Sequence, residues 1–276
     1  MLRAIECRED AVLYRFFLWV AAGSQLILAV ERWRARYQVK FEQLLDARGE
    51  FEALSALACY AYEHPGDTSP DLIDGSARFE AREMGHPLLS DRTCVTNDIA
   101  LDDATRFYIV SGSNMAGKST LLRAIGLNAI LAAAGAPVRA RQARIIVMTI
   151  CASIAVRDSL TDGASKFFAE VERLRDSIAK ARNGELVLFL VDEMLAGTNS
   201  QDRRIAAGWM LEALIAAGAV GALSTHDLAL TEIVQREHFR ETNIHMQCRS
   251  QDDPLDFDYY LRPGIASQTN GWRLCA

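Results

Sequence analysis

The segment GSNMAGKS, residues 112–119, fits the pattern G-x-x-x-x-G-K-[ST] at every fixed position. It stands between RFYIVS, a run with the composition of a strand, and STLLRAIGLNAILAAA, a run with the composition of a helix. Phosphate-binding loops have this strand–loop–helix context, at the carboxyl end of a parallel strand. The motif in its context therefore predicts an α/β fold that binds a phosphorylated ligand.

Each part of this loop has a physical role in holding phosphate. Glycines let the backbone curl so that N–H groups point inward, and the following helix adds the positive end of its dipole. Lys118 would reach the β- and γ-phosphates, and the Ser119 hydroxyl could bind Mg²⁺. A simple turn with an exposed lysine is the competing interpretation, which the flanking elements disfavour. We expect the phosphates of ATP to be held by Gly112, Ser113, Asn114, Met115, Ala116, Gly117, Lys118, Ser119 and Thr120.

The second half of such a site must hold the metal and polarise water. The apolar run LVLFLV, residues 186–191, reads as a central strand, and Asp192 and Glu193 follow it directly. Because ligands bind at the carboxyl ends of strands in open α/β sheets, Asp192 would hold Mg²⁺ and Glu193 would orient and deprotonate the attacking water. Paired carboxylates are also common at helix starts, so the loop upstream is what favours the catalytic interpretation.

His226 is a third candidate, because it follows the next apolar run, AVGALST. There it would stand at a strand's carboxyl end and could sense or hydrogen-bond the γ-phosphate. The alternative is a histidine that caps a helix or lies on the surface, since Asp227 and Leu228 resemble a helix start. The position in the sheet favours a role in the site.

Strand-like and helix-like runs alternate from Arg106 onward. The β-rich runs RFYIVS, RIIVMTI, LVLFLVD and AVGALST are separated by helical stretches that begin near Lys118, Ser165 and Asp202. This alternation predicts a mostly parallel sheet covered by helices. Further on, TNIHMQC and FDYYLR flank the turn-rich SQDDPLD, which predicts an antiparallel pair appended to that sheet.

The N-terminal part has a different character. Its first sixty-odd residues show apolar positions at helical spacing and predict long helices. A cluster of prolines and glycine near residue 65 then marks a boundary. We expect a helical segment over residues 1–64 and the α/β domain over residues 65–276. The apolar run at residues 11–30 has the length of a membrane span, but Arg15, Ser24 and Gln25 interrupt it, which favours a buried or partner-facing helix over a membrane anchor.

Composition limits the partners. With 276 residues, half of them apolar, the chain can bury a full-sized core. The formal net charge of −6 gives no general basic surface, so any DNA contact would be local or made by segments outside this chain. The six cysteines are scattered without a C-x-x-C pair, which favours isolated buried thiols in a reducing, cytoplasmic compartment.

The residues resemble the ATPase domain of MutS-type DNA mismatch-repair proteins. The resemblance rests on GSNMAGKSTLLRAIGLNAILAAAGAPVRA, DSLTDGASKFFAEVERL, LFLVDEMLAGTNSQDRR and STHDLAL, in the order of that family. FEALSALACYAYEHP and GHPLLSD extend it back to about residue 50. It implies a P-loop NTPase of the ABC-like type, with a mostly parallel sheet plus antiparallel strands, preceded by an α-helical segment.

The resemblance also implies a composite site in a homodimer, in which each ATPase domain completes the other. Ser165, in GASKFF, would begin a helix whose N-terminus faces the γ-phosphate held by the partner; without the resemblance, the residues favour an ordinary capped helix. Asn114 would contact the phosphates, and residues 197–200 would meet their twin across the dimer. Lys166 and Ala116 depart from the family, which usually has threonine and glycine there. The aromatic residue that stacks on adenine is replaced near Cys94 and Val95, leaving the adenine site unassigned.

The chain has no room for the family's mismatch-reading domain, its connector or its full clamp. The sequence thus predicts the Mg²⁺-dependent ATPase domain of a MutS-like DNA mismatch-repair or DNA-transaction protein. In this interpretation, ATP-driven dimerisation is coupled to DNA or a DNA-bound partner. The alternative is an ATP-gated interaction module with little hydrolysis and no direct mismatch recognition.

Overall fold

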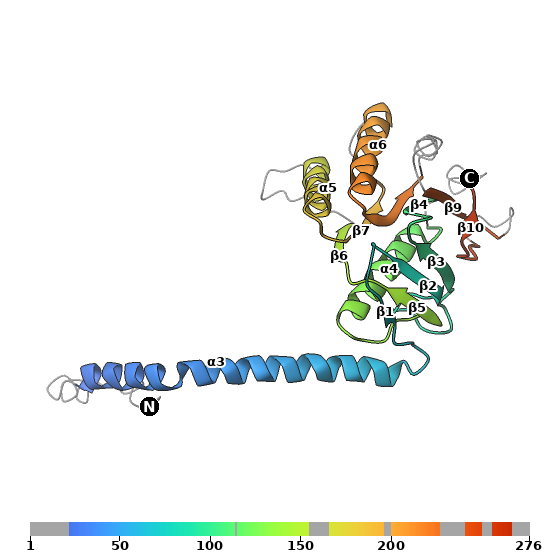
Figure 1. The fold of residues 1–276 in the computed structure, drawn as a ribbon. Helices are drawn as coiled ribbons and strands as arrows, with labels where there is room; N and C mark the ends of the chain where they lie inside the picture. The colour runs from blue at the N-terminus through green and yellow to red at the C-terminus, as the bar shows by residue number, and fades with distance from the viewer. Residues whose placement is uncertain are drawn as a thin grey trace. The chain divides into compact units, whose positions relative to one another are not determined.

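A computed structural model describes residues 22–113, 115–154, 166–195, 200–226, 241–249 and 256–266. The chain divides into two compact units, Met1–Tyr62 and Glu63–Ala276. In the first, the described residues form one helix, α3 (Ala22–Glu63), which is 42 residues long (Figure 1). Within the described part of the chain, no helix combines the length and the apolar character that crossing a membrane requires.

The second unit is built on a six-stranded sheet with the order β10-β9-β4-β8-β7-β6. Its strands β9, β4, β8, β7 and β6 run parallel, and β10 is antiparallel to β9. This is the mostly parallel sheet that the alternating sequence pattern predicts. In chain order the strands are β4 (Phe107–Gly112), β6 (Thr149–Ser153), β7 (Val187–Asp192), β8 (Val220–Thr225), β9 (Glu241–Met246) and β10 (Arg262–Pro263).

Helices cover both faces of this sheet. Successive residues of β7 point to opposite sides: Leu188 and Leu190 join one core cluster with α4 (Lys118–Ala133), whereas Val187, Phe189 and Val191 join a second cluster with α5 (Lys166–Arg182) and α6 (Ser200–Ala216). Figure 1 shows α4 apart from the α5 and α6 pair. A strand buried on both faces explains the uninterrupted apolar run.

A second sheet, with the order β1-β5-β2-β3, packs into the same core as α4. Its strands are β1 (Asp71–Leu72), β2 (Phe79–Met84), β3 (Asn97–Leu101) and β5 (Gln142–Ile145). The buried side chain of Asn128 ties α4 to this sheet region: its Nδ2 donates to the Gly85 carbonyl at 3.0 Å, and its Oδ1 accepts from the Arg139 N–H at 2.8 Å.

Three expectations differ from the structure. The run RIIVMTI is divided between β5 and β6, which belong to different sheets. The C-terminal pair exists as β9 and β10, with an isolated bridge from Cys248 to Phe257, but β9 is itself a parallel member of the main sheet beside β4. Cys59 is exposed rather than buried.

The tight contact between the central strands gives a stability prediction. Gly221 in β8 is opposite Phe189 and Phe107, whose rings lie 6.3 Å apart. A Cβ on Gly221 would lie 2.1 Å from the Phe189 carbonyl oxygen, so Gly221→Ala should lower the free energy of unfolding by about 2–3 kcal/mol in urea denaturation. Gly66→Ala, which adds a Cβ with no atom within 4 Å, should change it by less than about 0.5 kcal/mol. Equal losses in the two variants would contradict this packing.

Candidate nucleotide site

The predicted phosphate loop connects the end of β4 to the start of α4. Gly112 has φ 146° and Gly117, the N-cap of α4, has φ 97°. Both values favour glycine. Space is limited as well, because a Cβ on Gly112 would lie 2.5 Å from the Met246 carbonyl oxygen. Met115 has a left-handed backbone at φ 67°, whereas the buried Ala116 does not have a positive φ. The backbone at Ala116 therefore does not require the glycine that is usual in the family.

Lys118 is turned back into this loop. Its Nζ donates to the carbonyl oxygens of Gly112 at 2.9 Å and Ser113 at 2.8 Å, and the residue is only 5% exposed. Burial lowers the pKa of Lys118, and the nearby carboxylates of Glu193 and Asp192 oppose that change. An ammonium group held among carbonyl oxygens at a helix N-terminus suits an anionic ligand with several oxygens.

The end of β7 is tied to the end of β8. The Ser224 hydroxyl donates to the Asp192 carboxylate, and the Glu193 N–H donates to the Ser224 carbonyl oxygen at 3.1 Å. Glu193 has φ 55°, a conformation that L-residues other than glycine adopt rarely and that is concentrated at functional sites. The chain therefore turns sharply after the strand.

Glu193 and His226 meet across neighbouring strands. The Nδ1 atom of His226 lies 3.3 Å from Oε1 of Glu193, and both side chains are roughly half exposed. The two residues directly follow β7 and β8, which are paired in parallel. Parallel strands bring their carboxyl ends to the same edge of the sheet, and this explains the contact.

Behind Glu193, the turn is held by a buried carboxylate. Oε1 of Glu170, on α5, accepts the Leu195 N–H at 2.8 Å, and Glu170 is 2% exposed. Nε of Arg203, on α6, donates to the Leu195 carbonyl at 3.2 Å. On the same helix, Leu174 lies in the core, with Val171 and Ile178 packed against it, whereas Phe168 is exposed.

A cavity of about 830 Å³ opens beside the first turn of α4. A cavity of this size falls in the range of small-molecule sites. Among the predicted residues, Met115, Gly117, Lys118, Ser119, Thr120 and Glu193 line it. Gly112, Ser113 and His226 contact lining residues, and Ala116 and Asp192 are next to lining residues in the chain. The far wall comes from β2, β3 and the segment between them, from β9 and from the segment before β10: Met84, His86, Leu89, Thr93, Val95, Asn97, Met246 and Tyr259.

Tyr259 is the aromatic residue of this wall, and sequence reasoning did not identify it. A Cβ on Gly117 would lie 2.9 Å from Cδ1 of Tyr259, so the ring lies against the phosphate loop. Tyr259 has φ 60°. It was missed because it is far from the loop in sequence and follows a turn-rich segment, where FDYYLR predicts only a strand.

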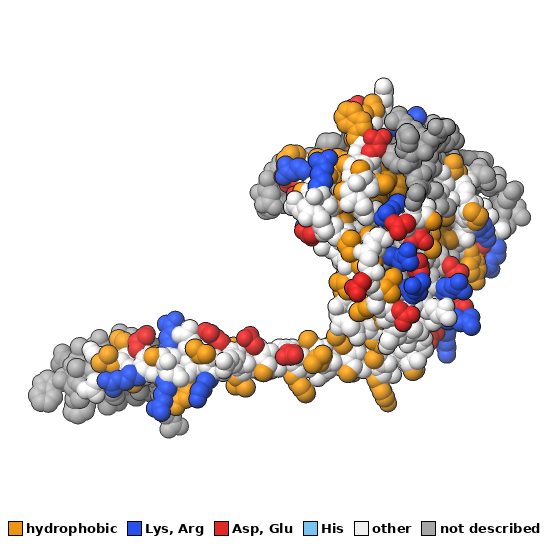
Figure 2. Space-filling view, viewed as in Figure 1, with side chains coloured by type: hydrophobic (Ala, Val, Ile, Leu, Met, Phe, Trp, Pro, Cys, Tyr) orange, Lys and Arg blue, Asp and Glu red, His pale blue; other side chains and the backbone are white. Residues whose placement is uncertain are grey.

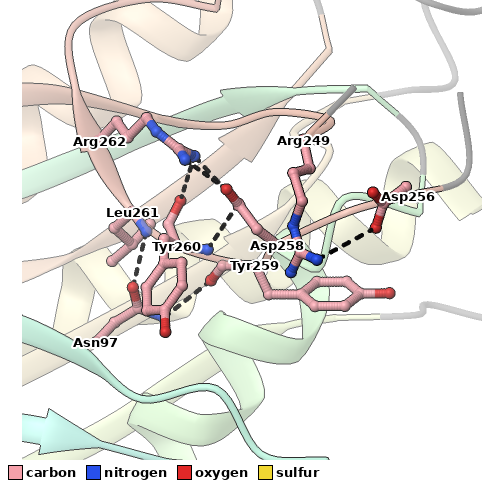
Figure 3. Close-up of polar contacts among 8 residues, drawn as sticks. All are labelled: Asn97, Arg249, Asp256, Asp258, Tyr259, Tyr260, Leu261 and Arg262. Carbon is pink, nitrogen blue, oxygen red and sulfur yellow. Dashed lines mark hydrogen bonds and ion pairs between the residues drawn. The ribbon is translucent and has the colours of Figure 1, made fainter. Parts of the chain in front are cut away.

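A polar network fixes the backbone around Tyr259 (Figure 3). Nδ2 of Asn97 donates to the Tyr259 carbonyl at 3.0 Å, and Oδ1 of Asn97 accepts the Leu261 N–H at 2.7 Å. The buried Asp258 pairs with both terminal nitrogens of Arg262, and this contact holds the pKa of Asp258 below its usual range. Asn97 from β3 thereby anchors the segment that carries the ring.

His86, in the far wall of the cavity, has a shifted pKa. Burial lowers the pKa of His86, and the positive charges of Arg123 and Arg139 act in the same direction. The imidazole therefore favours its neutral form, which suits a wall that contacts an uncharged ring system.

The described residues fit ATP and Mg²⁺ by their donor set. The first turn of α4 presents N–H groups without intrahelical acceptors, beside the buried ammonium of Lys118. No group of three or more His, Cys, Asp or Glu residues in the described ranges could hold a metal on its own. A hydroxyl, one carboxylate and phosphate oxygens are a set that Mg²⁺ accepts, and Ser119 and Asp192 would supply the protein's share. Asn114, Ser165 and residues 197–199 lie outside the described residues.

Comparison with known proteins agrees with this geometry. The family described as MutS domain V matches residues 108–276. The DNA mismatch repair protein MutS of Thermus thermophilus is 32% identical over 268 residues, which are 95% of this chain and 31% of that protein. MutS of Brevibacillus brevis is 30% identical over 271 residues, with shares of 96% and 31%. The chain thus spans about a third of the length of the curated relatives it matches.

The anchoring by Asn97 can be measured directly. Asn97→Ala removes the acceptor of the Leu261 N–H and the donor to the Tyr259 carbonyl, so the Leu261 amide should exchange hydrogen at least about tenfold faster. Asn183→Ala is the matched control, because Asn183 is exposed and its side chain makes no hydrogen bond within the described residues. Unchanged exchange at Leu261 in Asn97→Ala would show that the segment is held by other contacts.

Proposed function

The chain belongs to the MutS family, whose domain V covers residues 108–276, and we propose that it binds ATP with Mg²⁺ in the cavity beside α4 and hydrolyses it. The observation that carries this proposal is the meeting of three strand ends. The loop after β4 surrounds Lys118, and the residues after β7 and β8 bring Glu193 and His226 within 3.3 Å of each other.

In this proposal the triphosphate lies along the first turn of α4. The N–H groups of that turn and the Lys118 ammonium bind its oxygens. On ligand entry, phosphate oxygens replace the carbonyl oxygens of Gly112 and Ser113 as acceptors from Lys118. Negative charge at this point favours the protonated lysine, against the effect of burial on its pKa.

Glu193 is the proposed general base. Its carboxylate lines the cavity and is 41% exposed, so water can reach it. It accepts a proton from the water that attacks the γ-phosphorus; the bond to the β–γ bridging oxygen breaks, and ADP and phosphate leave. His226 contacts the same carboxylate and orients it. Because His226 directly follows β8, at the edge of the sheet that holds the phosphates, it also contacts the γ-phosphate in this proposal. When bound by Ser119 and Asp192, Mg²⁺ would neutralise phosphate charge.

Tyr259 supplies a surface for the base of the nucleotide. An aromatic ring against the loop, with Val95, Leu89 and the neutral form of His86 in the same cavity, suits a planar heterocycle that stacks rather than one that is read by hydrogen bonds. We therefore propose this surface as the adenine site, which the sequence left unassigned.

The wider function is proposed from the relatives. They are named DNA mismatch repair proteins, and this chain covers the third of them that contains the ATPase. We propose that ATP binding brings two copies together, with Ser165 of one copy facing the phosphate of the other, and that the change is passed to DNA or a DNA-bound partner. The second candidate is an ATP-gated interaction module with little hydrolysis and no direct mismatch recognition. The net charge of −6 favours it, because an acidic chain gives no general attraction for DNA.

Glu193→Gln separates hydrolysis from binding. Loss of the base should lower steady-state ATP turnover about 100-fold or more while ATP still binds. Glu172→Gln is the matched control, since Glu172 is exposed on α5 away from the cavity, and it should retain the wild-type rate. Chelation of Mg²⁺ by EDTA should abolish turnover. Equal rates in wild type and Glu193→Gln would overturn the role of Glu193, whereas ATP binding with hardly any turnover in the wild type itself would favour the second candidate.

A further inference from the structure

Helix α3 leaves large apolar side chains exposed along its length, and among them is a row that only Lys40 interrupts. Val30, Trp33, Leu44, Phe51 and Leu54 are 37% to 72% exposed. Large apolar side chains gathered on one surface indicate a site of association. Nothing in the ATP site accounts for this row, because no residue of α3 lines that cavity.

The row follows a seven-residue repeat. Taking Val30 as position a, the a and d positions from residue 26 to residue 61 are all apolar except Lys40. A repeat of this length, sustained over five heptads, is typical of helices that wrap around each other. We call these positions the seam: Leu26, Val30, Trp33, Tyr37, Lys40, Leu44, Ala47, Phe51, Leu54, Ala58 and Ala61.

The charges of α3 are divided between its halves. Lys and Arg predominate in the N-terminal half, at Arg32, Arg34, Arg36 and Lys40 against Glu31, and Asp and Glu predominate after it, at Glu42, Asp46, Glu50 and Glu52 against Arg48. Figure 2 shows blue side chains toward the N-terminal end of the helix and red ones nearer its middle. A second helix lying antiparallel would bring each basic half against an acidic half, whereas a parallel helix would bring like charges together.

We propose that α3 pairs with α3 of a second copy of this chain as an antiparallel coiled coil. The seam selects one centred register, with the two-fold axis beside Glu42. In it Val30 faces the partner's Leu54, Trp33 faces the partner's Phe51, and Tyr37 faces the partner's Ala47. Large residues meet small ones or stack as rings, which is how facing layers fill space.

Two further contacts support the same register. Lys40 faces the partner's Leu44, and its long stem can cover the leucine while its ammonium reaches water. At the edge of the seam, Arg36 lies opposite the partner's Glu50, and the two-fold axis makes this pair twice. Both are the kind of flanking or single polar position that fixes orientation and register in coiled coils. The Arg36 pairs offset the like charges that Arg34 and the partner's Arg48 bring together at the other edge of the seam.

This pairing is separate from the ATP-dependent contact of the proposed function. It uses only α3, so it occurs without nucleotide. Sedimentation equilibrium of the full chain, free of ATP and Mg²⁺, is therefore the test. The wild type should be a dimer, and Leu54→Glu should raise the dimer dissociation constant about 100-fold or more, because each of the two charges is buried against the partner's apolar Val30.

Val39→Glu is the matched control for Leu54→Glu. Val39 is 64% exposed and Leu54 is 59% exposed in α3, but Val39 is off the seam, so Val39→Glu should remain dimeric. Circular dichroism of both variants checks that α3 stays helical. A monomeric wild type, or equal dimerisation in wild type and Leu54→Glu, would overturn the proposal, and so would a fall in Val39→Glu as large as that in Leu54→Glu.

Charge reversal tests the antiparallel direction. Arg36→Glu alone and Glu50→Arg alone should each weaken the dimer about tenfold, since each creates two like-charge pairs. The double variant should regain most of the lost affinity, because it restores opposite charges at both places. A double variant as weak as the single ones would overturn the proposed register.

Discussion

The structure around the candidate site depends on a buried ammonium group. Lys118 is 5% exposed, and burying a charge is costly unless other groups compensate it. The carbonyl oxygens of Gly112 and Ser113 do so directly, and Asp192 and Glu193 do so through their charge. The left-handed glycines, the close approach of Met246 and the sharp turn at Glu193 all keep these groups around one point. There the phosphates of a ligand can compensate the charge of Lys118 in place of the carbonyl oxygens.

The order of the strands makes this arrangement possible. β4, β8 and β7 are neighbours and run parallel, so the residues after each strand meet at one edge. Burial on both faces of β7 holds that edge rigidly: α4 covers one side, and α5 and α6 the other. Gly221 lets two phenylalanine rings close over the centre of the sheet. Packing of the core and placement of the charged groups are thus consequences of the same topology.

Local sequence patterns predict the phosphate loop and the parallel sheet, but they do not predict contacts between segments that are far apart in the chain. The loop before Lys118 and the apolar run before Asp192 are continuous segments whose neighbours define them, so the parallel sheet could be predicted. RIIVMTI was not resolved into β5 and β6, because periodicity does not mark where a short apolar run leaves one sheet for another. Tyr259 and Asn97 come together only through tertiary pairing, and no local signal connects them.

The most direct measurement is calorimetric titration of the wild-type chain, in Mg²⁺, with a non-hydrolysable ATP analogue and, separately, with adenosine. If the edge formed by β4, β7 and β8 holds phosphates around Lys118, the analogue should bind at least about 100-fold more tightly than adenosine, because charge-assisted contacts to the phosphates supply most of the affinity. Equal affinity for the two ligands, or no binding of the analogue, would contradict a phosphate site at this edge.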